Sequence, residues 1–280
     1  MPARSAKPLT AAKAQFIRSL VKQKKERDRE RAFVLEGEKP ILELLDSDAT
    51  ALLALVVGES RLSQTDAGIK QVLRHKSVPI YSCRDSVFDS LSDVTSPSGI
   101  LAVVRQPIWD RQAILSRSPL LGLYGETLQD PTNVGTIVRT ALGFGLDALW
   151  LSADSADVFN PKVVRTTAGG ILKLPVLYIK DVAELTGHGC ALLASVPAGK
   201  ASRPITDLTD LPERTVLAFG NESRGLSDAT LRQASVRFHI PVSQAIESLN
   251  VAASAAIAAF YFRTIFERKP PSQHRSSLGR

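Results

Sequence analysis

The sequence predicts an α/β protein with a parallel sheet in its C-terminal part and a smaller α/β domain before it. The chain has 280 residues, of which 44% are hydrophobic, so it can form one large domain or two ordinary ones. From residue 119 onward, short apolar runs alternate with stretches of helical periodicity. This βα alternation is typical of a parallel sheet that is covered by helices on both faces.

The segment 120–152 shows this repeating unit most clearly. An apolar run at 120–124 suits a buried strand, and a polar turn that contains Pro131 follows it. The next residues repeat apolar side chains at helical spacing, and a second apolar run comes at 148–151. Strand, turn, helix and strand in this order form a βαβ unit.

The other expected elements follow from the same patterns. In the C-terminal part we expect further strands at 175–179, 191–196, 215–219 and 235–240, and helices at about 134–144, 161–168, 181–186, 226–233 and 246–266. In the N-terminal part we expect strands at 33–37, 51–57, 78–82 and 100–105, and helices at 9–25, 41–45, 62–74 and 86–91.

Composition places the domain boundary in a polar stretch that Pro107 and Pro119 flank. The last residues of the chain are rich in Pro, Ser and basic side chains, a composition that cannot form a core. We therefore expect an N-terminal arm and α/β domain at 1–106, a linker at 107–118, the C-terminal domain at 119–267 and a disordered tail at 268–280.

The net charge of +7 is concentrated at the start of the chain. Residues 1–40 hold eleven basic and five acidic side chains, and so carry six of the seven net charges. A basic arm on a nearly neutral body favours a polyanionic partner, above all nucleic acid. We expect phosphate contacts from Lys22, Lys24, Lys25 and Arg27. The alternative is a solvated helix face with no partner.

Cysteine and histidine usage limits the other possibilities. The two cysteines, Cys83 and Cys190, lie far apart in apolar surroundings, which indicates buried thiols in a reducing compartment and hence a cytoplasmic protein. The longest apolar run, 251–262, is too short to span a membrane, and the N-terminal residues lack the apolar core of a signal peptide. The four histidines are scattered, so we expect no metal site.

Three polar or glycine-rich loops follow predicted strands: 130–139, 220–225 and 240–250. Because parallel strands end at one edge of their sheet, these loops predict a shared ligand pocket there. Gly220 and Gly225 allow close backbone approach or positive φ.

Glu222 is either a functional carboxylate or the cap of a helix that begins near residue 226. Ser248 and Asn250 are in the same way either site residues or caps of the last helix. The chain contains no phosphate-binding GxxxxGK[ST] loop, and Gly143-Phe144-Gly145 lacks the third glycine of a dinucleotide-binding fingerprint. This absence disfavours a nucleotide-cofactor oxidoreductase.

Taken together, the three loops resemble the three motifs of the SpoU-type (TrmH-type) RNA ribose methyltransferases of the SPOUT superfamily. The matching residues are Asn133-x-Gly135-x-x-x-Arg139, then Gly220-Asn221-Glu222-x-x-Gly225, then Ile240-Pro241 with Glu247-Ser248-Leu249-Asn250-Val251, and the intervening Asn160-Pro161-Lys162-Val163-Val164-Arg165 with Ala168-Gly169. The match covers about residues 118–266. It departs from the family pattern at Thr132, Gln244 and Ala252.

The N-terminal half resembles, more loosely, the substrate-binding domain that is often fused to these enzymes. Lys24, Arg27, Phe33, Glu36, Gly37 and 98–102 carry that part of the resemblance.

The resemblance implies a deep trefoil knot in the C-terminal domain, a homodimer, and methylation of a ribose 2′-hydroxyl by S-adenosylmethionine without a metal. The RNA is expected to be rRNA rather than tRNA. Cofactor binding is implied for Gly220, Asn221, Ile240, Pro241 and Leu249. The implied catalytic group is Arg139, Asn133, Glu222, Ser248 and Asn250, in which Arg139 activates the hydroxyl electrostatically, because a guanidinium hardly ever deprotonates.

Two alternatives remain open beside methylation of rRNA. One is methylation of a tRNA ribose. The other is an RNA-binding protein that keeps the scaffold without catalysis, although the joint presence of Arg139, Glu222 and Asn250 speaks against it.

Overall fold

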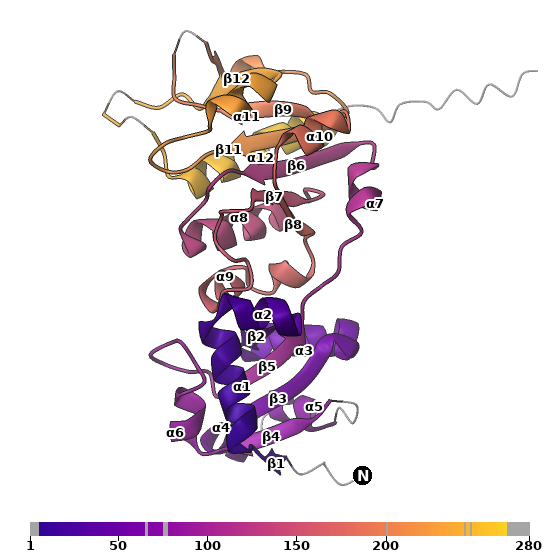
Figure 1. The fold of residues 1–280 in the computed structure, drawn as a ribbon, viewed down its shortest axis with the longest axis vertical. Coiled ribbons are helices and arrows are strands. Elements are labelled where there is room, and N and C mark those ends of the chain that lie inside the picture. The colour runs from indigo at the N-terminus through magenta and orange to yellow at the C-terminus, as the bar shows by residue number, and fades with distance from the viewer. Residues whose placement is uncertain are drawn as a thin grey trace, which may run out of the picture. The chain divides into compact units, whose positions relative to one another are not determined.

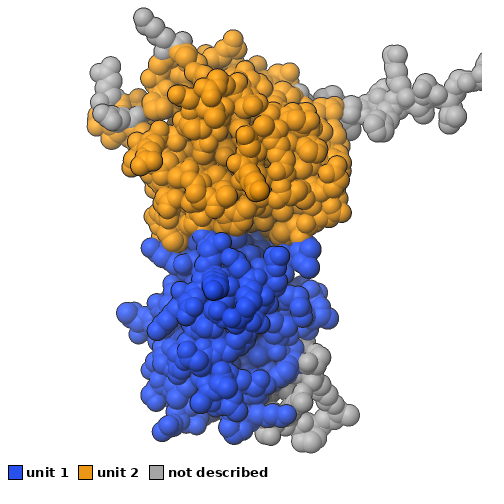
Figure 2. All heavy atoms as spheres, viewed as in Figure 1, with its two compact units in different colours: residues 1–108, 157–173 blue, residues 109–156, 174–280 orange. Residues whose placement is uncertain are grey.

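The computed structural model describes residues 6–64, 67–74, 78–199, 201–243, 245–246 and 248–267. The chain forms two compact units, coloured separately in Figure 2. Unit 1 comprises residues 1–108 and 157–173, and unit 2 comprises residues 109–156 and 174–280. Residues 157–173, which lie within the expected C-terminal domain, therefore group with unit 1.

Unit 1 contains a five-stranded mixed sheet in the order β1-β4-β3-β5-β2 (Figure 1). Its strands are β1 (Lys7–Pro8), β2 (Ala32–Glu36), β3 (Leu52–Gly58), β4 (Ile80–Cys83) and β5 (Ile100–Arg105). Its helices are α1 (Ala11–Lys22), α2 (Lys24–Glu30), α3 (Glu38–Asp48), α4 (Glu59–Ser63), α5 (Ala67–Arg74), α6 (Asp85–Asp89) and α9 (Pro161–Thr166), with 3₁₀ turns at Ala49–Ala51 and Gly170–Leu172. The small α/β domain is thus confirmed.

Two expected helices of unit 1 differ from the structure. The helix expected over 9–25 divides into α1 and α2, because Gln23 adopts an extended conformation with φ −124°. The helix expected over 62–74 is represented by α4 and α5, which are separate elements. In both places the helical spacing of apolar residues continues across an extended residue, Gln23 or Gln64, and the helix propensity of glutamine does not indicate a break there.

Unit 2 contains a seven-stranded sheet in the order β10-β12-β9-β11-β6-β7-β8, and every neighbouring pair is parallel. The strands are β6 (Leu120–Gly125), β7 (Leu149–Ser152), β8 (Val176–Ile179), β9 (Ala191–Ser195), β10 (Arg203–Pro204), β11 (Arg214–Phe219) and β12 (Val236–His239). The helices are α7 (Arg111–Leu115), α8 (Pro131–Gly143), α10 (Ala183–Gly187), α11 (Asp228–Gln233) and α12 (Val251–Glu267), with a 3₁₀ turn at Ile205–Asp207.

Helices cover both faces of this sheet, as the sequence predicted. On one face, Tyr124 and Trp150 pack in a core with Leu185 of α10. α12 packs against α8 and β11. All six residues of β6 and all four of β7 are buried, as is expected for strands covered on both sides.

Three boundaries in unit 2 differ from expectation. α7 forms inside the stretch expected to be a linker, and its Ile114 and Leu115 are buried in the unit 2 core. α12 begins at Val251 rather than at 246, and α8 begins at Pro131 rather than at 134. The tail expected at 268–280 lies outside the described residues, and the trefoil knot implied by the resemblance stays a prediction.

Some further expectations concern single residues. Cys83 and Cys190 are free and buried, as predicted, and burial raises the pKa of the Cys83 thiol to about 11. Among the described residues, no helix is long and apolar enough to cross a membrane. Within the same ranges, no three His, Cys, Asp or Glu side chains come close enough together to hold a metal ion.

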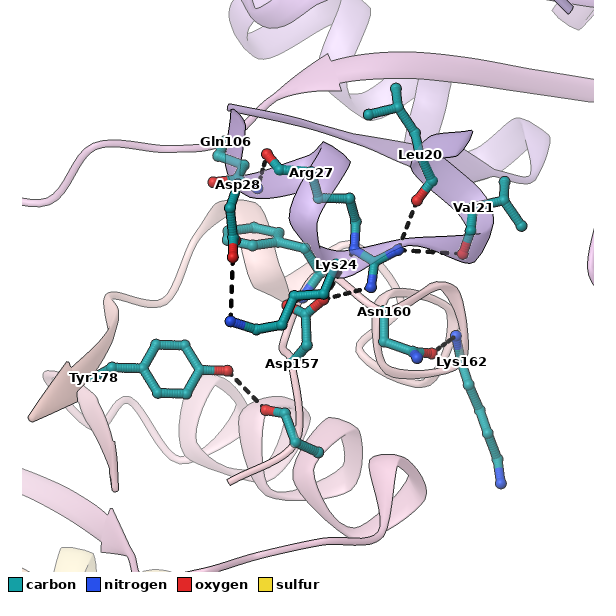
Figure 3. A network of polar contacts seen from close by, with 12 residues as sticks. Leu20, Val21, Lys24, Arg27, Asp28, Gln106, Asp157, Asn160, Lys162 and Tyr178 are labelled. Carbon is teal, nitrogen blue, oxygen red and sulfur yellow. Dashed lines mark hydrogen bonds and ion pairs between the residues drawn. The ribbon is translucent and has the colours of Figure 1, made fainter. Parts of the chain in front are cut away.

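The expectation that Arg27 contacts phosphate is wrong, because its side chain is only 3% exposed. Its polar contacts lie within the protein (Figure 3). Its Nε and Nη2 donate to Oδ2 of Asp157 at 2.8 and 2.6 Å, and its Nη1 donates to the carbonyl of Leu20 at 2.6 Å. Gln106 in turn donates to the Arg27 carbonyl at 3.0 Å. Arg27 therefore joins the end of α1, the residue that follows β5 and the start of the 157–173 segment.

We predict that Arg27→Gln lowers the free energy of unfolding of unit 1 by about 3–5 kcal/mol, because Asp157 then keeps a buried charge without its partner. Native-state hydrogen exchange of unit 1 amides in urea measures this loss. Lys25→Gln is the control, because Lys25 lies on the same helix and is exposed. Equal stability of the two variants would contradict the prediction.

Candidate active site

The three polar loops leave the carboxyl edge of the unit 2 sheet. The first follows β6, the second follows β11, and these two strands are direct neighbours in the sheet. The third follows β12, which β9 separates from β11. The topology thus brings together segments that are more than a hundred residues apart in sequence.

The first loop ends in the capped start of α8. Asp130 accepts a hydrogen bond from the Thr132 amide at 2.8 Å, and Pro131 occupies the first helical position, where its missing N–H costs nothing. Since the helix begins there, Asn133 lies in its first turn and is only 7% exposed. Arg139, further along the same helix, is exposed.

The second loop is a tight hairpin closed by hydrogen bonds between Asn221 and Gly225 in both directions, at 3.1 and 2.8 Å. A Cβ on Gly220 would lie 2.1 Å from the carbonyl carbon of Gly225, and Gly225 itself has φ +68°. Both expectations for these glycines are confirmed: Gly220 permits close approach, and Gly225 permits positive φ.

The side chain of Asn221 holds the second loop to the first. Its Oδ1 accepts from the amides of Ser223 and Arg224 at 3.0 and 3.1 Å, and its Nδ2 donates to the Thr127 carbonyl at 2.9 Å. Most of its hydrogen-bonding capacity is thus used inside the protein. Asn221 shapes the loop that the resemblance assigns to the cofactor.

A chain of three side chains links the third loop to the first and second. Oδ1 of Asn250 accepts from the amides of Ala252 and Ala253 at 2.9 and 3.3 Å, so Asn250 caps α12. Its Nδ2 donates to Oδ1 of Asn133 at 3.0 Å. Nδ2 of Asn133 then donates to Oε1 of Glu222 at 2.8 Å.

The direction of this chain is fixed by the helix cap. The backbone N–H groups at the start of α12 can only donate, so the Asn250 amide must present its oxygen to them and its nitrogen to Asn133. Asn133 is then obliged to turn its own nitrogen toward Glu222. One oxygen of Glu222 is thereby held, while its other oxygen accepts from no residue within the described ranges.

The chain also decides between the interpretations left open for the polar residues. Asn250 is both a cap and a member of the site. Glu222 is not a helix cap, because Ser227 caps α11 by accepting from the Thr230 amide at 3.2 Å. Asn133, a member of the implied catalytic group, bonds to Glu222 and Asn250.

The other predicted site residues are less tied to the protein. No side chain in the described part of the chain accepts a hydrogen bond from Arg139, and Ser248 and Pro241 are exposed. Ile240 and Leu249 are half-buried. Gln244, one of the positions that depart from the family pattern, lies outside the described residues.

Sequence reasoning missed the residues that support the first loop. Thr127 adopts φ 55° and donates through its hydroxyl to Asp154 at 2.9 Å. Glu126 accepts from the backbone and hydroxyl of Ser227 at 2.7 and 2.8 Å and from the Thr230 hydroxyl at 2.6 Å. The available signal was the polar run 152–155, which follows β7 at the same edge of the sheet.

The third loop exposes apolar side chains to solvent. Val242 and Ile246 of the third loop are 36% and 48% exposed, and Ile240 and Leu249 of the same loop are half-buried. Small-molecule sites of this kind are mostly apolar and add a few placed polar groups. The second oxygen of Glu222, which accepts from no described residue, is a polar group placed in this way.

Comparison with known proteins gives the family. A model of the SpoU rRNA Methylase family matches residues 121–260, and a model of the MRM3-like substrate binding domain matches residues 12–102. The chain belongs to the SpoU rRNA methylase family. It is therefore an RNA methyltransferase, as the three motifs predicted.

Two relatives that act on 23S rRNA match over nearly their full length. The 23S rRNA (guanosine(2553)-2′-O)-methyltransferase RlmP of Bacillus subtilis is 31% identical over 265 residues, which cover 92% of this chain and 99% of the relative. The 23S rRNA (uridine(2479)-2′-O)-methyltransferase of Streptomyces viridochromogenes is 27% identical, with 92% of this chain and 91% of the relative covered.

Solved structures show the same fold. A TrmH-family protein from Porphyromonas gingivalis superposes with a TM-score of 0.75 at 30% identity, over 91% of this chain and 98% of that one. The SpoU methyltransferase AviRb from Streptomyces viridochromogenes, solved with AdoMet, superposes with a TM-score of 0.81 at 23% identity, over 93% and 100% of the two chains.

We predict that Asn250→Asp separates the two roles of this residue. The aspartate still caps α12 but cannot donate to Asn133, so methyl transfer should fall at least about tenfold while thermal stability stays unchanged. Asn250→Ala should in addition lose about 1 kcal/mol of stability with the cap. Thermal melting and single-turnover methylation measure the two effects, and full activity of Asn250→Asp would show that the chain is not needed.

Proposed function

We propose that this SpoU-family enzyme methylates a ribose 2′-hydroxyl in rRNA and that its methyl donor is S-adenosylmethionine. The observation that carries the proposal is the hydrogen-bonded chain from Asn250 through Asn133 to Glu222, which joins the three motif loops at one sheet edge. The names of the relatives RlmP and the 23S rRNA uridine methyltransferase, both 2′-O-methyltransferases of 23S rRNA, support rRNA as the substrate.

S-adenosylmethionine supplies an activated methyl group, so the protein's own task is to position the ribose hydroxyl and stabilise the charge that develops on it. Arg139 is suited to this task because it is exposed, uncommitted to any described residue, and always charged. Glu222 offers its second oxygen as an acceptor for a polar group of cofactor or ribose. Gly220, Ile240 and Leu249 contribute backbone and apolar contacts to the cofactor, with Pro241 and Ser248 beside them.

Of the two alternatives left open by the sequence, family membership speaks against the non-catalytic RNA-binding protein, so methylation of a tRNA ribose is the one that remains. A tRNA methyltransferase shares the same chemistry, so only the identity of the modified RNA separates the two. A protein that only binds RNA does not require the Glu222 carboxylate to be held in one orientation. Here Asn133 and Asn250 fix that orientation from the start of α12. The order in the site therefore favours catalysis.

Arg139→Ala tests the proposed chemistry. Ribose methylations are mapped across all RNAs of a strain that lacks this gene, and of the same strain complemented with the wild-type chain or the variant. We expect the wild type to restore one rRNA methylation. In single-turnover methylation with purified protein, the variant should be about a hundredfold slower, which is the effect of removing one charge-stabilising donor.

Arg139→Lys is the matched variant for this test. It should restore activity only in part, because an ammonium lacks the planar fork of the guanidinium. Both variants should keep the thermal stability and the S-adenosylmethionine affinity of the wild type, since the side chain is exposed. Restoration of a tRNA methylation would establish the first alternative, and near wild-type turnover of Arg139→Ala would overturn the role of this residue.

We also propose that the basic arm binds the RNA backbone. Of the four residues first expected to contact phosphate, Lys22 and Lys25 keep this role. Both are exposed, whereas Arg27 is buried and Lys24 pairs with Asp28 at 3.2 Å. Replacing both Lys22 and Lys25 with Gln should lower the slope of log affinity against log salt by up to about two.

The control for the arm is Arg29→Gln, because Arg29 already pairs with Glu26 and Glu30 at 2.5 and 2.8 Å. Filter binding across a salt series measures the slopes, and calorimetry without RNA checks that cofactor binding is unchanged. Unchanged RNA affinity and slope in the Lys22→Gln, Lys25→Gln variant would make the arm a solvated helix face only.

We further propose a homodimer that forms through the outer face of α12. Ile257 and Phe260 on this helix are 40% and 60% exposed, and the Phe260 ring lies 5.9 Å from that of Phe144 at the end of α8. Exposed apolar side chains grouped in this way mark an interface.

We predict that Phe260→Glu gives a monomer in sedimentation equilibrium, because it places a charge in this apolar surface. The control Ile108→Glu, at an exposed apolar residue outside α12, should leave the dimer intact. A wild type that sediments as a monomer would refute the dimer.

A further inference from the structure

The turn after β6 contains a residue in an unfavourable conformation. Thr127 has φ 55°, in the left-handed region, where a β-branched side chain is a genuine outlier. Such conformations persist only when the surrounding structure holds them in place. The contacts of Thr127 identify what holds it.

Every polar group of Thr127 is bound. Its amide donates to Oγ of Ser152 at 2.7 Å, its hydroxyl donates to Oδ2 of Asp154 at 2.9 Å, and its carbonyl accepts from Asn221 at 2.9 Å. The Ser152 hydroxyl donates to Oδ1 of Asp154 at 2.6 Å, which leaves the serine oxygen free to accept from Thr127. Asp154 thus acts on Thr127 through both of its oxygens.

The carboxylate of Asp154 is well placed for this role. Hydrogen bonds from Ser152 and Thr127 lower its pKa against the opposing effect of burial, so it remains an acceptor at neutral pH. The backbone carbonyl of Asp154 also accepts a hydrogen bond from the Gln129 side chain at 2.7 Å. Next to it, the Ser155 hydroxyl accepts from the Leu128 amide at 3.1 Å. The 152–155 segment therefore contacts the turn at three consecutive residues, 127–129.

The turn that contains Glu126 and Thr127 is hydrogen-bonded to both ends of the loop 220–225, which the proposed function assigns to the cofactor. Asn221, at the start of that loop, donates to the Thr127 carbonyl. Ser227, just after its end, donates twice to the Glu126 carboxylate, at 2.7 and 2.8 Å. The left-handed conformation of Thr127 sets the direction of its carbonyl, so a change at this residue would release the first of these two attachments.

We propose that Asp154 is a positioning residue for the cofactor loop 220–225: it holds Thr127 in the left-handed conformation from which Thr127 and Glu126 bracket that loop. The inference rests on the proposed function for the identity of the cofactor. Asp154 acts through Thr127 and Asn221, and this role requires no contact between Asp154 and cofactor or RNA. No motif that relates the sequence to its family includes it.

The test uses the full chain and measures S-adenosylmethionine affinity by calorimetry without RNA, together with KM and kcat in methylation. Asp154→Ala should weaken S-adenosylmethionine binding about tenfold and raise KM with little change in kcat, because releasing one unfavourable backbone conformation corresponds to a factor of this size. Asp154→Asn should stay within about threefold of the wild type, because an amide can still accept from Ser152 and contact Thr127.

A second substitution separates positioning from a general structural role. Thr127→Gly in the Asp154→Ala background should restore affinity to within about threefold of the wild type, because glycine adopts positive φ without support. Thr127→Ala in the same background removes the same hydroxyl but keeps Cβ, so it should not restore binding. Equal affinities of these two double variants, or wild-type affinity of Asp154→Ala, would overturn the proposal.

Hydrogen exchange of residues 220–226 distinguishes failure of this inference from failure of the proposed function. Asp154→Ala should lose protection at the Asn221 and Gly225 amides, and Thr127→Gly should restore it. A wild type that binds no S-adenosylmethionine but shows this exchange pattern would refute the cofactor and keep the positioning role. Unchanged protection in Asp154→Ala would refute the positioning role whatever the cofactor.

Discussion

The hydrogen bond between Asn133 and Glu222 is the interaction on which the arrangement of the site depends. It joins α8, which follows β6, to the loop after β11, and Asn250 extends it to the start of α12. Parallel strands bring these three segments to one edge of the sheet but do not fix their distances. The two amide side chains supply that missing constraint, because each can satisfy its partners in only one orientation.

Much of the fold could be predicted from the sequence because its strands are short, apolar and regularly spaced. The parallel sheet of unit 2 needed only that pattern. The grouping of residues 157–173 with unit 1 could not be predicted in the same way, because it depends on contacts between residues far apart in sequence. The buried pair of Arg27 and Asp157, 130 residues apart, is one of them, and the ring contact of Phe33 with Phe159 is another. In a sequence, a buried arginine looks the same as its exposed neighbours in a charged run.

The identity of the site residues was predictable, but their partners were not. The motifs placed Asn133, Glu222 and Asn250 at one sheet edge, whereas the direction of the hydrogen bonds required the cap of α12. Asp154 and Thr127 carry no motif, and the left-handed conformation of Thr127 has no sequence signal, because threonine is among the residues least suited to it. Support for a site is thus harder to find in a sequence than the site itself.

The hydrogen-bond inventory divides the polar residues of this edge into two groups. Asn221, Asn133 and the caps use most of their donors and acceptors within the protein, so they have little capacity left for a ligand. Arg139 and the second oxygen of Glu222 have no partner in the described part of the chain. A ligand gains most from groups that lose no existing bond when it arrives. We therefore propose that contact with ribose and cofactor falls to the uncommitted groups, while Asn133 and Asn250 hold Glu222 in place.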